Sequence, residues 1–152
     1  MPTPYKIEVK QTINAPVAKV FSIINDLNQF EHWNPFLAMD PNTQYKVSEN
    51  PGGEGASYSY ESKKLGKGNM TFTGVYDNSL IMLDMNFTAP NNETAKVEWR
   101  LTREGEGTEM TWTMTGERNF IMVVMVKVLG MDKMMTKHFA DGLAKLKAYA
   151  EK

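Results

Sequence analysis

MDKMMTKHFADGLAKLKAY, residues 131–149, is the stretch around which this chain is organised. Read at 3.6 residues per turn, it predicts a long amphipathic helix with a wide apolar stripe. The stripe consists of Met131, Met134, Met135, His138, Phe139, Gly142, Leu143, Leu146 and Tyr149. Such a stripe needs a broad apolar surface to cover it, and the strands predicted in the preceding hundred residues form the only one. We therefore look for function between that sheet and this helix.

The N-terminal part of the chain predicts one strand followed by a small helical pair. Alternating apolar and polar residues at 7–13 are typical of a strand with one wet face. Asn14 is expected as a helix N-cap with Pro16 near the first helical position, and the helical stripe runs to about residue 26. A second short turn of helix is expected at 28–31. The proline at position 35 disfavours helix before it, so 31–36 is expected as a loop.

Six further strands are predicted, separated by turns rich in glycine, asparagine and proline. Their expected ranges are 44–49, 56–62, 69–76, 80–87, 94–102 and 108–116. The last two alternate most cleanly, which indicates an antiparallel sheet with one apolar face and one solvated face. The glycine-rich turn at 52–55 is expected to be a hairpin and could form a mobile lip to a pocket. The apolar stretch 120–129 could be helical, and Gly130 is expected to separate it from the last helix.

Composition limits the possible partners. The 152 residues carry 17 basic and 18 acidic side chains, a net charge of −1, and no cysteine. This balance gives no reason to expect nucleic acid, and no cofactor is expected. With only His32 and His138 as imidazoles, a metal site is not expected either. No signal peptide is visible and the apolar stretch 120–131 is too short to span a bilayer, so we expect one cytoplasmic domain, residues 1–152, without stable membrane insertion.

Three stretches resemble one protein superfamily. They are INAPVAKVF at 13–21, FEHWNPF at 30–36, and the pair MDKMM at 131–135 with FADGLAKLK at 139–147. In this order they are similar to the START-like SRPBCC superfamily, in its polyketide cyclase/dehydrase and lipid-transport branch. The resemblance implies an α+β helix-grip fold, in which a curved antiparallel sheet of about seven strands wraps around a long C-terminal helix. It also implies an apolar cavity between them, but no particular function, because members of the superfamily differ in activity.

Gly142 lies near the centre of the helix stripe, where glycine costs about 1 kcal/mol relative to alanine. One interpretation is that a sheet side chain such as Trp99 or Trp112 packs on the bare backbone. The other is that the missing side chain leaves room for a ligand. His138, on the same face, is either a hydrogen-bonded core residue or the polar end of an apolar pocket, and it is the single weak candidate for a catalytic residue.

The remaining candidates line the expected pocket. Trp33, Asn34 and Phe36 could cap its entrance, or the two aromatic residues could only seal the helical pair onto the sheet. Tyr58 and Tyr60 share one face and could orient a polar group, or be core aromatics. The expected floor comprises Phe72, Met85, Phe87, Trp99 and Trp112, and the expected roof comprises Met134, Met135, His138 and Gly142. Methionines in such a place suit a ligand of imprecise shape, although they also fill ordinary cores.

These residues support three hypotheses. The first is non-catalytic binding of a small apolar molecule such as a lipid, a polyketide-like ring or an isoprenoid. The second is a cyclase or dehydratase acting on a poly-ketone in the same cavity. The third is an interaction module of the chaperone-activating type, which predicts a collapsed cavity and a contiguous exposed apolar patch. The sequence leaves the ligand, the oligomeric state and the existence of a reaction open.

Overall fold

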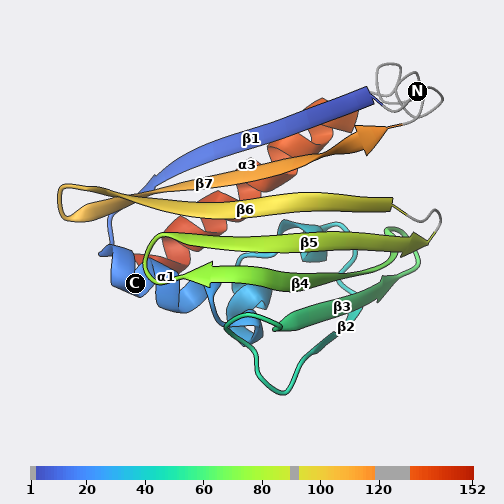
Figure 1. The fold of residues 1–152 in the computed structure, drawn as a ribbon, viewed down its shortest axis with the longest axis horizontal. Helices are drawn as coiled ribbons and strands as arrows, with labels where there is room; N and C mark the ends of the chain where they lie inside the picture. The colour runs from blue at the N-terminus through green and yellow to red at the C-terminus, as the bar shows by residue number, and fades with distance from the viewer. Residues whose placement is uncertain (1–2, 90–92, 119–130) are drawn as a thin grey trace.

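A computed structural model describes residues 3–89, 93–118 and 131–152 of the chain. Seven antiparallel strands form one sheet in the order β1-β7-β6-β5-β4-β3-β2 (Figure 1). The strands are β1 Thr3–Ile13, β2 Gln44–Val47, β3 Ser57–Ser62, β4 Gly66–Tyr76, β5 Leu80–Ala89, β6 Glu93–Glu104 and β7 Gly107–Arg118. Every predicted strand is present, and β2 to β7 are joined as an up-and-down meander. The strands that come first and last in the sequence, β1 and β7, are neighbours in the sheet. They pair over eleven residue pairs, from Thr3↔Arg118 to Ile13↔Thr108.

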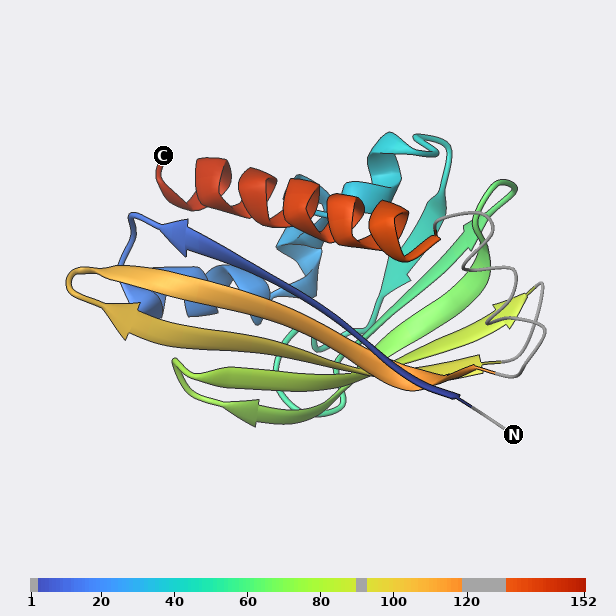
Figure 2. The same ribbon diagram turned by 90° about the horizontal axis from the view of Figure 1, so that it is seen from above.

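The helices lie on one face of the sheet. They are α1 Val17–Ile24, the 3-10 helices η1 Leu27–His32 and η2 Pro35–Ala38, and α3 Met131–Ala150. Figure 2 shows α3 running across the concave face of the curved sheet, with α1 beside the C-terminal end of α3. The architecture is therefore the predicted α+β helix-grip arrangement, in which the strands bend around the terminal helix.

Local details of the first helical segment differ from the prediction. Pro16, not Asn14, is the N-cap of α1, and no side chain caps this helix. The Asn14 N–H instead donates to a carboxylate oxygen of Glu151 at 2.8 Å, which ties the end of the chain to the end of β1. The expected loop at 31–36 contains the end of η1 and the start of η2. Asn34 caps η2, because its Oδ1 accepts the Phe36 N–H at 2.9 Å.

The strands are mostly longer than their patterns predicted, because hairpin ladders continue into the turns. β4 starts at Gly66, inside the stretch expected to be a turn, and β1 extends back to Thr3. Two strands are shorter: β2 ends at Val47 and β3 begins one residue late, at Ser57. The prediction for 120–129 lies outside the described residues, whereas α3 begins at Met131, directly after the expected break.

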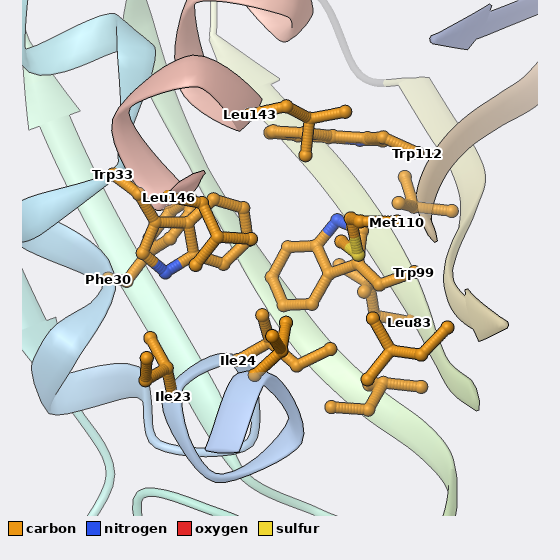
Figure 3. Close-up of a cluster of buried hydrophobic side chains, with 14 of the residues drawn as sticks. Ile23, Ile24, Phe30, Trp33, Leu83, Trp99, Met110, Trp112, Leu143 and Leu146 are labelled. Atoms are coloured by element: carbon orange, nitrogen blue, oxygen red, sulfur yellow. The ribbon is translucent and has the colours of Figure 1, made fainter. Parts of the chain in front are cut away.

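A cluster of aromatic side chains fills the space between the sheet and the C-terminal half of α3. Trp99 lies at its centre and is fully buried, with Trp33 at 4.8 Å and Trp112 at 5.8 Å between ring centroids, both edge-to-face. Trp112 stacks on Phe139 of α3 at 4.3 Å. Figure 3 shows Leu143 and Leu146 of the helix among these rings. This part of the interior is solid core, and we call it the closed end of the grip.

The glycine-rich turn at 52–55 is not a lip of the pocket. Gly53 N–H donates to Asn25 Oδ1 at 2.9 Å, and Leu27 N–H donates to the Pro51 carbonyl at 2.9 Å. A Cβ at Gly52 would lie 2.2 Å from the Asn25 carbonyl oxygen. The turn is thus docked against the end of α1, where glycine is required for the close approach of two backbones.

Candidate functional site

Burial decreases along the inner face of β5 toward its C-terminal end, and one residue of β3 at the same end is also incompletely buried. On β5, the inward-facing Ile81 and Leu83 are fully buried, whereas Met85 and Phe87, further along the same face, are half-buried. On β3, Tyr58 is buried and Tyr60 is half-buried. Side chains two residues apart share a face of a strand, so these changes occur within one continuous surface. At this end of the sheet, Met85, Phe87 and Tyr60 are thus incompletely covered, although Met70, Ala95 and Ser62 beside them are buried.

Burial decreases along α3 in the same direction. Leu146, Leu143 and Phe139 are buried, whereas Met135, one turn earlier than Phe139, is half-buried. Met134 is 50% exposed, so its expected place in the pocket roof is wrong. At about 100° per residue it lies about 140° around the helix from Phe139, outside the stripe that faces the sheet. The beginning of α3 and the ends of β3 and β5 are therefore both underpacked, at what we call the open end of the grip (Figure 2).

Six of the predicted site residues are half-buried at this open end, and we call them the mouth residues. They are Phe36, Tyr60, Met85, Phe87, Met135 and His138. Phe36 links the helical side of the group, with ring centroids 6.0 Å from His138 and 6.4 Å from Phe139. The strand register links the sheet side, because Tyr60 is opposite Gly68 and Gly68 is opposite Phe87.

Five other predicted residues lie in the closed end instead. Trp33, Tyr58, Phe72, Trp99 and Trp112 are all at most 4% exposed. They contact one another directly or through Phe30, which is 4.8 Å from Trp33 and 5.2 Å from Tyr58 between ring centroids. Trp33 and Phe36 were expected either to cap the pocket entrance or to seal the helical pair onto the sheet. The buried position of Trp33 matches the sealing role. Phe36 lies at the mouth instead. The sequence placed all of them on the inner surface but could not distinguish its two ends.

Gly142 has a packing partner, but not the one expected. A Cβ built on Gly142 would lie 2.9 Å from Pro35 Cδ and 3.1 Å from the Trp33 carbonyl oxygen. The loop before η2 therefore occupies the space that we had assigned to a sheet indole or to a ligand. Because a proline ring and a backbone carbonyl cannot easily move aside, this contact fixes the middle of α3 against the loop.

Asn34 connects the closed end to the mouth. Its Nδ2 donates to the Tyr58 hydroxyl oxygen at 3.2 Å, while its Oδ1 holds the Phe36 N–H. Burial raises the pKa of Tyr58, so this phenol stays protonated. Tyr58 also stacks on Tyr45 of β2, whose hydroxyl donates to Glu31 at 2.7 Å. Asn34 is thus a structural link that positions Phe36.

Two mouth residues keep polar atoms without a protein partner. Neither the Tyr60 hydroxyl nor the His138 ring makes a hydrogen bond within the described ranges 3–89, 93–118 and 131–152. A Cβ at Gly68 would lie 2.8 Å from the Tyr60 hydroxyl and 3.0 Å from its Cε1, so the phenol ring lies directly over the Gly68 backbone. Burial raises the pKa of Tyr60, which keeps it a proton donor. Gly68 was missed at the sequence level, where it was assigned to a turn.

Outside the mouth, the described residues offer little other chemistry. They contain no group of three or more histidine, aspartate or glutamate residues placed to hold a metal ion. Asp84 faces the outer side of the sheet, where it pairs with Lys96 at 2.7 Å. The exposed large apolar side chains among them are Tyr45 on β2, Tyr76 on β4, Met82 on β5 and Met134 on α3. This distribution does not form the contiguous patch that an interaction module would require.

No helix within residues 3–89, 93–118 and 131–152 has both the length and the apolar character needed to cross a bilayer.

The fold defines a helix-grip protein whose mouth residues are half-buried. A family model described as polyketide cyclase / dehydrase and lipid transport matches residues 4–151, and the chain belongs to this family. The predicted resemblance is thereby confirmed over nearly the whole chain. No curated protein matches the sequence.

Solved structures with the same fold have low sequence identity. A protein from Rhizobium leguminosarum superposes with a TM-score of 0.72 at 13% identity, covering 99% of this chain and 97% of its own. CV1439 from Chromobacterium violaceum gives 0.70 at 15% identity, covering 97% of each chain. DynU16, from the dynemicin biosynthetic locus, gives 0.68 at 17% identity and covers 96% of this chain, which spans only 47% of DynU16. At these identities the similarity shows the fold alone.

Proposed function

We propose that this protein binds a small, largely apolar molecule at the open end of the grip without transforming it. The observation that carries this proposal is the parallel loss of burial along two facing layers. On the sheet it runs from Leu83 to Phe87, and on α3 from Phe139 to Met135. Apolar side chains left half-exposed on facing inner surfaces are typical of ligand sites, because filling the site removes that surface from water.

The proposal assigns different roles to the predicted residues. The six mouth residues contact the ligand, with Met85, Phe87 and Tyr60 on the sheet side and Phe36, Met135 and His138 on the helix side. The buried indoles and Phe72 form a rigid end wall, since each is already packed against protein. The family description, which includes lipid transport, supports an apolar ligand.

The test uses two methionines on opposite faces of β5. Met85 faces inward and is half-buried, whereas Met82 is 38% exposed on the outer face. Purified protein would be incubated with a lipid extract and examined by native mass spectrometry. We expect bound lipid with the wild type and with Met82→Trp, and its loss with Met85→Trp, which fills the mouth. Binding that is absent from the wild type, or equally retained by both variants, would contradict the proposal.

The family description also names cyclases and dehydrases, and this supports one enzymatic alternative. In it, a poly-ketone enters the same mouth and the unpaired polar groups of Tyr60 and His138 act on it. General acid–base chemistry needs such groups within hydrogen-bonding reach of the reacting atoms. Turnover of a poly-ketone that is abolished by His138→Ala, with the fold and binding intact, would favour the enzyme. Turnover unchanged by this substitution would remove His138 from any chemical role.

A further inference from the structure

Around the mouth, the inner surface of the grip carries no lysine or arginine in the part of the chain that the structure describes. Strand positions alternate except at two bulges of β4, at Lys67/Gly68 and Phe72/Gly74, so the inward side chains can be read from the register and burial. They are Ile7, Val9, Gln11 and Ile13 on β1, Thr108, Met110, Trp112 and Met114 on β7, Ala95, Val97, Trp99 and Leu101 on β6, Ile81, Leu83, Met85 and Phe87 on β5, Gly68, Met70 and Phe72 on β4, and Tyr58, Tyr60 and Ser62 on β3. None of these is charged, but two carboxylates lie beside them. Glu93, at the start of β6, is opposite Phe87, and the buried Asp40 accepts a hydrogen bond from the inward-facing Ser62 at 2.6 Å.

The cations nearest in sequence to the mouth are directed elsewhere. Lys67, beside Gly68, pairs with Glu61 at 3.3 Å, and Lys96, beside Ala95, pairs with Asp84 at 2.7 Å. On α3, Lys133 and Lys137 are exposed. Within the described ranges, the inner surface therefore offers no partner to a buried anion. Transfer of an unpaired charge into such a site is strongly unfavourable.

The polar atoms that do face the mouth favour an acceptor on the ligand. The Tyr60 hydroxyl is a donor held over Gly68 and has no protein acceptor among the described residues. Its raised pKa keeps the proton in place. An unsatisfied half-buried donor discriminates between ligands that can accept its hydrogen bond and ligands that cannot.

From these observations, and resting on the proposed binding function, we infer that the site selects non-anionic ligands bearing an oxygen that accepts a hydrogen bond from Tyr60. Ketones, esters and similar neutral apolar molecules fit this description. A molecule that must place a carboxylate or a phosphate against the inner surface does not.

Three probes of matched size test this selection: 2-acetylnaphthalene, 2-ethylnaphthalene and 2-naphthoate. Equilibrium dialysis in one common buffer would give the dissociation constant of each. We expect the ketone to bind most tightly, the hydrocarbon less tightly, and the carboxylate at least about tenfold more weakly than the ketone. Naphthoate binding as tight as that of the ketone would overturn the inference and leave the binding site standing. Binding of none of the three would overturn both proposals.

The role of Tyr60 is tested with a matched pair of tyrosines. Tyr60→Phe should lower ketone affinity to the level of 2-ethylnaphthalene and leave hydrocarbon binding unchanged. Tyr76→Phe is the control, because Tyr76 is 54% exposed on β4, and it should change neither affinity. Circular dichroism would establish that both variants are folded. A preference for the ketone that survives Tyr60→Phe would overturn the assignment of Tyr60 as the donor.

Discussion

The closed end and the open end of the grip are built on the same two elements but differ in what fills them. At the closed end, Leu143 and Leu146 of α3 interdigitate with Trp99 and Trp112 of the sheet, and all four are nearly inaccessible to water (Figure 3). At the open end, the equivalent inward positions are occupied by methionine, tyrosine and phenylalanine side chains that stay half-exposed. One end therefore contributes stability, and the other leaves surface for a ligand.

The closed end also contains buried donors that lack acceptors. The indole N–H groups of Trp33, Trp99 and Trp112 have no hydrogen-bond partner within the described residues. Their rings meet edge-to-face, and in Figure 3 the Trp99 nitrogen lies on the side of its ring that faces Trp112. An N–H group that points at the face of an aromatic ring gains a weak attraction. This attraction is one reason why three indole N–H groups can be buried together without conventional acceptors.

The largest predicted difference between the two ends is the loss of stability when a single side chain of α3 is replaced by alanine. Leu143→Ala should reduce the free energy of unfolding by about 2–5 kcal/mol, because it opens a cavity in packed core. Met135→Ala, two turns earlier, should cost less than about 1.5 kcal/mol, because Met135 already contacts solvent. Urea unfolding followed by tryptophan fluorescence measures both. Equal losses would show that the open end is as well packed as the closed end.

Gly142→Leu should have the next largest effect, since it forces a side chain against Pro35 and the Trp33 carbonyl. We expect a loss of about 1–3 kcal/mol from overpacking. Ala144→Leu is the matched control on the exposed side of α3 and should change stability by less than about 0.5 kcal/mol. A neutral Gly142→Leu that abolished lipid binding would instead mean that the position borders the ligand.

A smaller, pH-dependent effect is expected at the loops around the open end. Ser62 Oγ donates to Asp40 Oδ2 at 2.6 Å, and this bond holds the pKa of Asp40 below its usual value. Because the folded pKa is depressed, the associated stability is present above the unfolded pKa and is lost as pH falls through the folded pKa. Ser62→Ala should raise the pKa of Asp40, as measured by NMR titration. The stability difference from wild type should shrink on acidification, whereas a constant difference would contradict this role.

The smallest effect is expected from Met134→Gln. With half of its surface exposed, Met134 should tolerate a polar side chain of similar length with less than about 0.5 kcal/mol change in stability. Lipid retention measured by native mass spectrometry should also stay unchanged, since Met134 points away from the inner surface. Loss of bound lipid in this variant would mean that Met134 contacts the ligand, as the sequence predicted.

The periodicity of the sequence was sufficient for the strands, the terminal helix and their apolar faces, and the family resemblance supplied the helix-grip arrangement. Alternation at β6 and β7 and the stripe on α3 determine which side chains face inward, because burying one face is the dominant gain on folding. The exact helix caps were less predictable. Asn14 is a good N-cap residue by type, but its backbone donates to Glu151, 137 positions away, a contact that no local pattern contains.

By itself, the spacing of residues along each element determined that an antiparallel sheet and a terminal helix have facing apolar surfaces, whereas the curved, wrapped arrangement was predicted only from the family resemblance. The tertiary structure decided where those surfaces touch. Trp99 and Met85 lie on the same inner face, yet one is core and the other borders the mouth, because the distance between sheet and helix depends on contacts such as Pro35 on Gly142 that join segments far apart in the chain. The sequence pattern shows which face of an element a residue lies on, but not how deeply that residue is buried.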